Sequence, residues 1–119
     1  MDTALRELSE TLAGLDGRDQ VYPRLDAVLA PLTQYDARTG SDLVHTLRTY
    51  VEHGGALAET GDSLFLHRNS VLYRLHRIKD LSGIDAHDRA TRLTLLVAWA
   101  LADASVLRQN SAYPPAQAK

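Results

Sequence analysis

The sequence predicts an all-α protein, a helical bundle around one hydrophobic core. Apolar residues recur at spacings of three and four along most of the chain, β-branched clusters are few, and alternating apolar and polar runs are absent. Of the 119 residues, 45% are hydrophobic and 24% are charged, which is typical of a globular domain and too apolar for a disordered chain. The length suits one domain.

Two amphipathic helices are expected in the first forty residues. Their apolar stripes are Leu5, Leu8, Leu12 and Leu15, then Leu25, Val28, Leu29 and Leu32. Asp16-Gly17 marks a turn after the first stripe. Pro31 should kink or restart the second helix, because proline lacks a backbone N–H and its ring crowds the preceding turn. Residues 1–40 are therefore predicted to form an N-terminal helical arm.

A third helix is predicted after Gly40. Ser41 or Asp42 can cap it by accepting a hydrogen bond from a free backbone amide in its first turn. One face carries Leu43, Leu47, Tyr50 and Val51, and His53-Gly54-Gly55 ends the helix.

The last predicted helix begins after Asp85 or Asp88, either of which can cap it. Its apolar stripe consists of Leu93, Leu96, Val97, Ala100, Leu101 and Ala104. This stripe is apolar enough to lie across the core or to pair with a second subunit. Periodicity is lost after Arg108, so the domain is expected to span residues 41–108 and residues 109–119 to be a disordered tail.

Between these elements the chain has the spacing of a helix-turn-helix. A short helix over residues 56–64, a three-residue break and a helix over residues 68–81, closed by Ser82-Gly83, are predicted. Helices joined by so short a turn cross steeply and need small or branched apolar residues where they meet. Gly61 is the small residue of the first helix. The apolar wedge consists of Leu57, Leu64, Leu66, Val71 and Leu75.

The helix over residues 68–81 has one buried and one outward face. Val71, Leu75 and Ile78 fall within about 60° of one another at 100° per residue and form the buried face. The outward side is basic, because residues 64–79 contain four Lys or Arg, two His and no acid in a chain of net charge −2.

This outward face suits double-stranded DNA, with the helix in the major groove. The residues predicted for base edges are Asn69, Tyr73 and Arg77, and those predicted for phosphates are Arg68, Ser70 and Arg74. His67, at the turn, is expected either to contact DNA or to cap or pack against the helix. For Tyr73 the alternative is packing across the helix junction, with only its hydroxyl reaching a phosphate.

Several short sequence motifs resemble those of a known family. They are TLRTYVEHGG from Thr46, HRNSVLYRL from His67, then Arg77-Ile78 and Leu81-Ser82-Gly83. Because of these motifs, the stretch from Leu43 through Leu101 resembles the C-terminal DNA-binding domain of the PucR and CdaR regulators, a Fis-like helix-turn-helix. The resemblance implies a bacterial ligand-responsive transcription regulator, whose small-molecule effector is bound by a sensory segment ahead of this chain. Residues 1–40 are then expected to be the end of the linker from that segment. No cofactor is expected.

Three residues depart from the family's pattern. Leu72 stands where arginine is usual, so one expected DNA contact is missing or replaced by an apolar contact, such as one to a thymine methyl. Ala56 stands where an asparagine cap is favoured, at a cost of about 1 kcal/mol unless Gly55 serves. Gly61 replaces alanine, at up to ~1 kcal/mol in a helix.

A homodimer is expected on DNA, since one recognition helix buries too little surface for tight binding and paired half-sites about 34 Å apart would remedy this. The last helix and the N-terminal arm are the candidate dimer surfaces. The alternative function is a helical protein–protein interaction or dimerisation module, whose basic face meets an acidic partner without base readout.

Other classes are disfavoured by what the sequence lacks. There is no cysteine for disulfides or thiolate catalysis, no catalytic constellation of an enzyme, and no third ligand near His45 and His53 for a metal. The longest apolar run, Leu95–Ala102, is too short for a membrane span, and the acidic N-terminus does not resemble a secretion signal. The expected location is cytoplasmic and nucleoid-associated.

Overall fold

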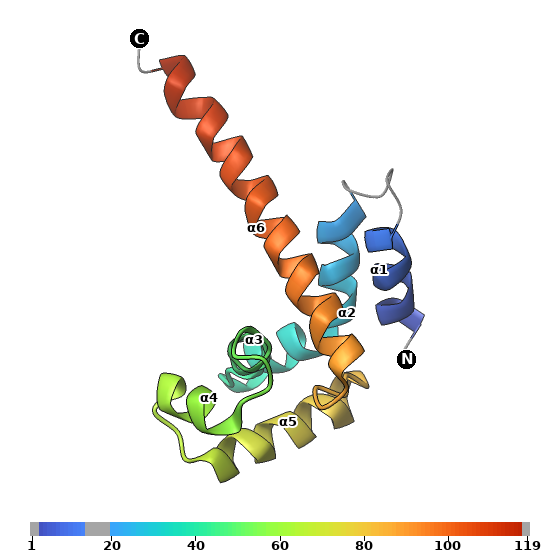
Figure 1. The fold of residues 1–119 in the computed structure, drawn as a ribbon, viewed down its shortest axis with the longest axis vertical. Coiled ribbons are helices and arrows are strands. Elements are labelled where there is room, and N and C mark those ends of the chain that lie inside the picture. Colours follow the sequence, from blue (N-terminus) through green and yellow to red (C-terminus); the bar gives the residue numbers. More distant parts are fainter. Residues whose placement is uncertain (1–2, 14–19, 118–119) are drawn as a thin grey trace.

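A computed structural model describes residues 3–13 and 20–117 of the chain. These residues form six α-helices and no strand, which confirms the all-α prediction (Figure 1). The helices are α1 (Thr3–Ala13), α2 (Val21–Thr39), α3 (Leu43–Glu52), α4 (Leu57–Leu64), α5 (Arg68–Ser82) and α6 (Arg89–Gln117). None of the helices in the described part is long and apolar enough to cross a membrane.

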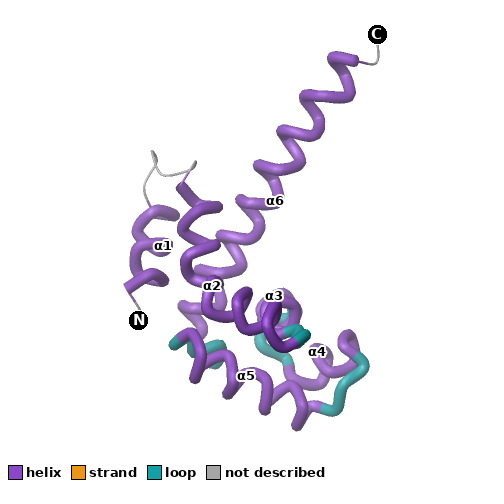
Figure 2. The backbone as a smooth tube through the Cα atoms, turned by 180° about the vertical axis from the view of Figure 1, so that it is seen from behind, coloured by secondary structure: helices purple, strands orange, loops and turns teal. Residues whose placement is uncertain are grey.

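One hydrophobic core joins the N-terminal helices to the rest of the domain. α1 packs against α2 and α6, and α2 packs against α3 and α5 as well (Figures 1 and 2). The predicted stripes of α2 and α3 are buried in this core, as are Leu5 and Leu8 of α1, whereas Leu15 and the predicted turn Asp16-Gly17 lie outside the described residues. The first forty residues therefore share a core with the helices that follow; that they end a linker from a sensory segment stays a prediction.

α2 runs without a restart through Pro31, so the restart that the sequence left open does not occur. Pro31 is exposed, and so is Ala27, whose carbonyl loses its usual partner because proline has no N–H to donate. Water can bond that carbonyl on the exposed side, and the buried side of the helix continues undisturbed.

The cap of α3 differs from the prediction. Asp42 is the N-cap residue, but its side chain makes no capping hydrogen bond. The carboxylate of Asp36 instead accepts from the backbone N–H groups of Leu43, at 2.9 Å, and Val44, at 3.0 Å. The capping acid thus comes from the preceding helix, because Gly40, at φ 73°, turns the chain back so that the end of α2 faces the start of α3.

Removing this cap is expected to destabilise the domain. Asp36→Ala leaves two amides of α3 without their acceptor and should lower the free energy of unfolding by about 1 kcal/mol. Urea denaturation followed by circular dichroism measures the change. Asp26→Ala, which removes an exposed carboxylate from the same helix, is the matched control and should leave the unfolding midpoint nearly unchanged. Equal midpoints for the two variants would argue against the cap.

Of the two residues predicted as possible caps of α6, Asp88 is the one that caps it. Its Oδ2 accepts from the backbone N–H of Thr91 at 3.0 Å and from the Thr91 hydroxyl at 2.8 Å, and these bonds lower the pKa of the Asp88 carboxyl. Asp85 serves the turn before the helix, where it accepts from the N–H of His87.

α6 buries a different face from the one the sequence singled out. Its core-facing residues are Thr91, Leu95, Ala98, Trp99 and Ala102. The predicted stripe, here called the outer stripe of α6, is exposed: Leu93, Leu96, Val97, Ala100, Leu101 and Ala104. The alternative in which this stripe lies across the core is therefore wrong. Both sides of α6 are apolar, and the side that carries the large Trp99 ring is the one that packs inward.

The far end of α6 also differs from expectation. The pattern predicted that the last helix ends near Arg108, whereas α6 extends to Gln117. A disordered tail over residues 109–119 stays a prediction. α6 leaves the body of the domain in Figure 1, so this end of the helix has no core to face and shows no apolar periodicity.

Candidate nucleic-acid interface

The turn between α4 and α5 is closed by Gly61 and Phe65. Phe65 adopts the left-handed conformation at φ 58°, the only non-glycine positive φ among the described residues, and the Leu66 N–H then donates to the Gly61 carbonyl at 2.8 Å. A Cβ atom at Gly61 would lie 2.6 Å from the Leu66 carbonyl oxygen. The prediction of a small residue at the helix crossing is confirmed. The atom that a side chain at Gly61 would meet is the carbonyl oxygen of Leu66, which belongs to the turn.

The two ends of the helix-turn-helix follow the prediction closely. α4 begins after Ala56, and Ala56, not Gly55, is its N-cap residue. Ala56 is extended, and its side chain makes no capping hydrogen bond. α5 ends at Ser82 and is capped by Gly83, which adopts the left-handed conformation at φ 78° and donates its N–H to the Lys79 carbonyl.

His67 caps α5. Its backbone is extended and its Nδ1 accepts from the backbone N–H of Asn69 at 3.0 Å, so the capping role that the sequence left open is present. The ring is exposed, and a DNA contact through its other nitrogen stays a prediction.

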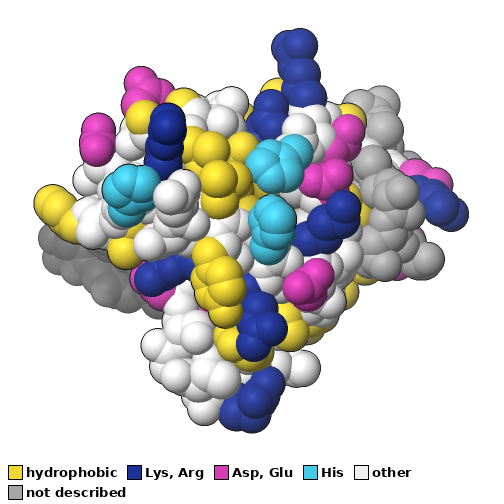
Figure 3. All heavy atoms as spheres, turned by 90° about the horizontal axis from the view of Figure 1, so that it is seen from below, with side chains coloured by type: hydrophobic (Ala, Val, Ile, Leu, Met, Phe, Trp, Pro, Cys, Tyr) yellow, Lys and Arg dark blue, Asp and Glu magenta, His cyan; other side chains and the backbone are white. Residues whose placement is uncertain are grey.

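The buried and outward faces of α5 lie as predicted. Val71, Leu75 and Ile78 are buried. The exposed candidates are His67, Arg68, Asn69, Ser70, Tyr73 and Arg77. Tyr73 is 68% exposed, so its ring does not pack across the helix junction. Figure 3 shows the underside of the molecule, where basic and histidine side chains are spread over a surface with fewer acids among them.

Arg74 is held differently from its neighbours. It is half-buried, and its Nη1 donates to the Thr46 hydroxyl of α3 at 2.9 Å. Thr46 is itself buried and donates to the Asp42 carbonyl. Sequence reasoning gave no role to Thr46, because the two partners are 28 residues apart and no local pattern links them.

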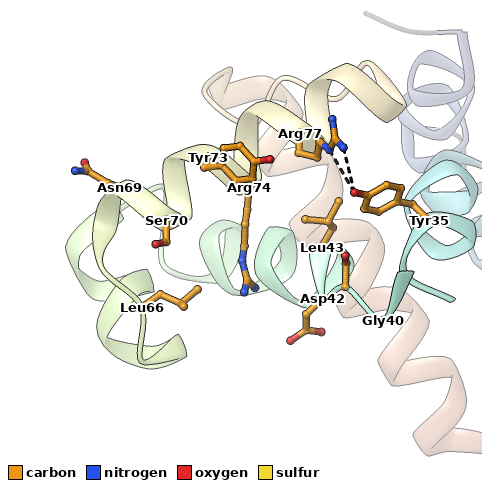
Figure 4. A pocket seen from close by; sticks show the side chains of 11 residues that line it. Tyr35, Gly40, Asp42, Leu43, Leu66, Asn69, Ser70, Tyr73, Arg74 and Arg77 are labelled. Atoms are coloured by element: carbon orange, nitrogen blue, oxygen red, sulfur yellow. Dashed lines mark hydrogen bonds between the residues drawn. The ribbon is translucent and has the colours of Figure 1, made fainter. Parts of the chain in front are cut away.

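A cleft of about 620 Å³ runs beside α5 (Figure 4). One wall comes from the junction of α2 and α3, with Tyr35, Gly40 and Asp42, and the other from α5, with residues from Asn69 to Arg77. The Tyr35 hydroxyl accepts from Arg77 Nε at 3.4 Å and Nη2 at 3.3 Å, so Arg77 leans toward α2. The cleft therefore places α2 next to the predicted DNA-binding face.

The site consists of a short helix, a three-residue turn and a second helix whose outward face is basic and exposed. This geometry defines a helix-turn-helix protein. Residues 43–101 match the family model of the PucR C-terminal helix-turn-helix domain. This part of the chain belongs to that family, a domain of transcription regulators and not of enzymes.

Curated relatives agree with this assignment. The chain is 39% identical over 56 residues to the purine catabolism regulatory protein of Bacillus subtilis, which covers 47% of this chain and 10% of the relative. It is 36% identical over 72 residues to the carbohydrate diacid regulator of Escherichia coli, covering 60% and 19%. It is 31% identical over 67 residues to the proline-responsive transcriptional activator PutR of Bacillus subtilis, covering 56% and 16%. No solved structure matches the chain significantly.

Proposed function

We propose that this domain binds double-stranded DNA sequence-specifically by placing α5 in the major groove. The observation that carries the proposal is the outward face of α5, which the turn and the buried Val71, Leu75 and Ile78 hold clear of the protein. The face is basic, and six of the seven predicted contact residues on it are exposed, all except Arg74. An α-helix of this kind fits the width of the groove.

The side chains divide into two roles. Asn69 and Tyr73, which point to solvent from the first half of α5, are proposed to reach base edges. Arg68 and Ser70 are proposed to hold phosphates beside the N-terminus of the helix, whose free amides favour anions. Arg74 uses a donor on Thr46, and its remaining donors are proposed to bind a phosphate.

The test begins with selection of a preferred site from a random DNA library. Asn69→Ala is then expected to weaken binding to the selected site by about 1–3 kcal/mol and binding to random DNA much less, because only a base contact depends on sequence. Fluorescence anisotropy measures both affinities. Gln20→Ala removes an exposed amide from the start of α2 and is the matched control. Equal losses on the two DNAs would contradict base readout by Asn69.

The alternative is a helical module whose basic face binds an acidic protein. That function predicts no enrichment of any sequence from the random library, so the selection step separates the two functions before any variant is made.

We also propose that the domain acts as a homodimer, paired through the outer stripe of α6. The side chains of Leu93, Leu96, Val97 and Leu101 are 37–48% exposed, and no charged residue belongs to the stripe. A two-fold interface pairs the same patch with itself, and an uncharged patch meets its own copy without repulsion. A second copy also supplies the second recognition helix that tight binding to paired half-sites needs.

Ligand response is proposed to reside outside this domain. The chain spans 10–19% of the three relatives compared above, one of which is named as proline-responsive. We propose that an effector of the regulator that contains this domain binds a segment beyond these residues, and that the protein acts on DNA in the cytoplasm, at the nucleoid.

A further inference from the structure

We propose that Arg38 and Arg77, held against the ring of Tyr35, form a clamp for a phosphate of the DNA backbone, so that α2 takes part in DNA binding. The proposal rests on the proposed function and adds to it a contact that lies outside the helix-turn-helix. It also gives Arg77 a phosphate in place of the base edge expected from the sequence.

The two guanidinium groups share one aromatic ring. The Arg38 guanidinium carbon lies 5.3 Å from the centroid of the Tyr35 ring, and that of Arg77 lies 5.5 Å from it. Both distances are those of a cation–π contact. Arg77 also donates to the Tyr35 hydroxyl, as the dashed lines in Figure 4 show. Tyr35 therefore holds one cation from its own helix, Arg38, and one from α5, Arg77, which is 42 residues from Tyr35 in the chain.

The charge of this cluster is only partly compensated by its neighbours, since Asp80, three residues after Arg77, attracts it without forming an ion pair. Neither arginine forms an ion pair with an acidic side chain in the described part of the chain. The acid nearest in sequence to Tyr35 and Arg38, Asp36, directs both carboxylate oxygens at the start of α3. Two like charges on one ring repel each other, and an anion bound between them would turn that repulsion into attraction for both.

The hydroxyl of Tyr35 completes the chemistry that a phosphate needs. Its oxygen accepts the hydrogen bonds from Arg77, and its own O–H is left to donate. A phosphate beside the Tyr35 hydroxyl would receive donors from Arg77 and from Tyr35, and the Arg38 guanidinium on the same ring adds a second positive charge for it. Arginine forks match the geometry of phosphate oxygens.

The position of the clamp fits the edge of a groove. Asn69 and Ser70, proposed to face DNA, line the same cleft as Tyr35 and Arg77. In Figure 4 Asn69 lies near one end of this surface, and Tyr35 and Arg77 lie at the other. A helix in the major groove has a phosphate backbone along its sides, so the element at the edge of the cleft, the end of α2, is the one that meets a backbone.

Arg38→Ala tests the clamp directly. The variant is expected to bind both the selected site and random DNA about three- to tenfold more weakly, and the slope of log affinity against log salt should shrink by about one, because one phosphate contact is lost. Arg6→Ala removes the same charge from an exposed site on α1, which packs against α2 and α6, and is the matched control. It should change neither the affinity nor the salt slope by a comparable amount.

A double-mutant cycle tests whether Tyr35 positions Arg77. Tyr35→Phe keeps the ring but removes the hydroxyl, and should weaken binding about two- to threefold in the wild-type background and by clearly less in an Arg77→Ala background, where only the donor of Tyr35 to the phosphate is lost. Its thermal unfolding midpoint should match the wild type, which separates positioning from a loss of stability.

Two results would overturn the clamp. If Arg38→Ala behaves like Arg6→Ala, α2 makes no phosphate contact. If Arg38→Ala weakens binding to the selected site alone, the contact is to a base. Either result leaves the proposed function intact provided that Asn69→Ala still shows its sequence-dependent loss, so failure of the clamp and failure of DNA readout are distinguishable.

Discussion

Valine in place of Gly61 is expected to lower the free energy of unfolding by about 3 kcal/mol, the upper part of the usual range for overpacking. A Cβ atom at this position would lie 2.6 Å from the Leu66 carbonyl oxygen, and a backbone atom cannot move aside as a flexible side chain can. Relief requires the turn to shift, which would break the hydrogen bond from Leu66 N–H to the Gly61 carbonyl. Urea denaturation measures the loss.

Alanine at the same position separates two physical accounts. Helix propensity alone predicts that Gly61→Ala stabilises α4 by up to ~1 kcal/mol, whereas the close approach of the turn predicts destabilisation. Ser63→Val, which places the same β-branched side chain at an exposed position of α4, is the control for valine and should cost about 0.5 kcal/mol or less. A Gly61→Ala variant more stable than the wild type would contradict the geometry of this turn.

The sequence predicted the helix-turn-helix well because its signals are local. Gly61, the three-residue break and Gly83 act through backbone geometry within a few residues, and the buried face of α5 follows from helical periodicity. The outward candidates on α5 follow from the same periodicity. Patterns of this kind can be read without knowledge of the rest of the fold.

What the sequence missed depends on residues that are distant in the chain. Asp36 caps α3 across a turn, Tyr35 binds Arg77 from 42 residues away, and Thr46 holds Arg74 from 28 residues away. α6 shows a related failure: both of its faces are apolar, so periodicity could not choose between them, and the packing of Trp99 decided. Long-range packing selects among alternatives that local patterns leave equal.

Glutamate at both Leu93 and Val97 is expected to separate the proposed dimer. Binding to a two-half-site operator should then weaken by about 100-fold or more, because linking two binding modules raises the apparent affinity by about 10²–10⁴ over that of one module. Both side chains lie on the outer stripe of α6 and are 46–48% exposed, so the charges reach solvent in the monomer and meet their own copies in the dimer. Light scattering measures the mass with and without operator, and anisotropy measures affinity.

A single half-site is the internal control for this variant. Its affinity should be unchanged, because α6 is not part of the proposed DNA-binding face, and a loss there would point to damage within the domain. Ala27→Glu with Thr33→Glu adds the same two charges at exposed positions of α2 and should leave the mass on operator unaltered. If the wild-type domain binds the operator as a monomer, the outer stripe of α6 is not a dimer interface. The exposed apolar face of α6 would then need another partner, whereas base readout by α5 would stand on its own test.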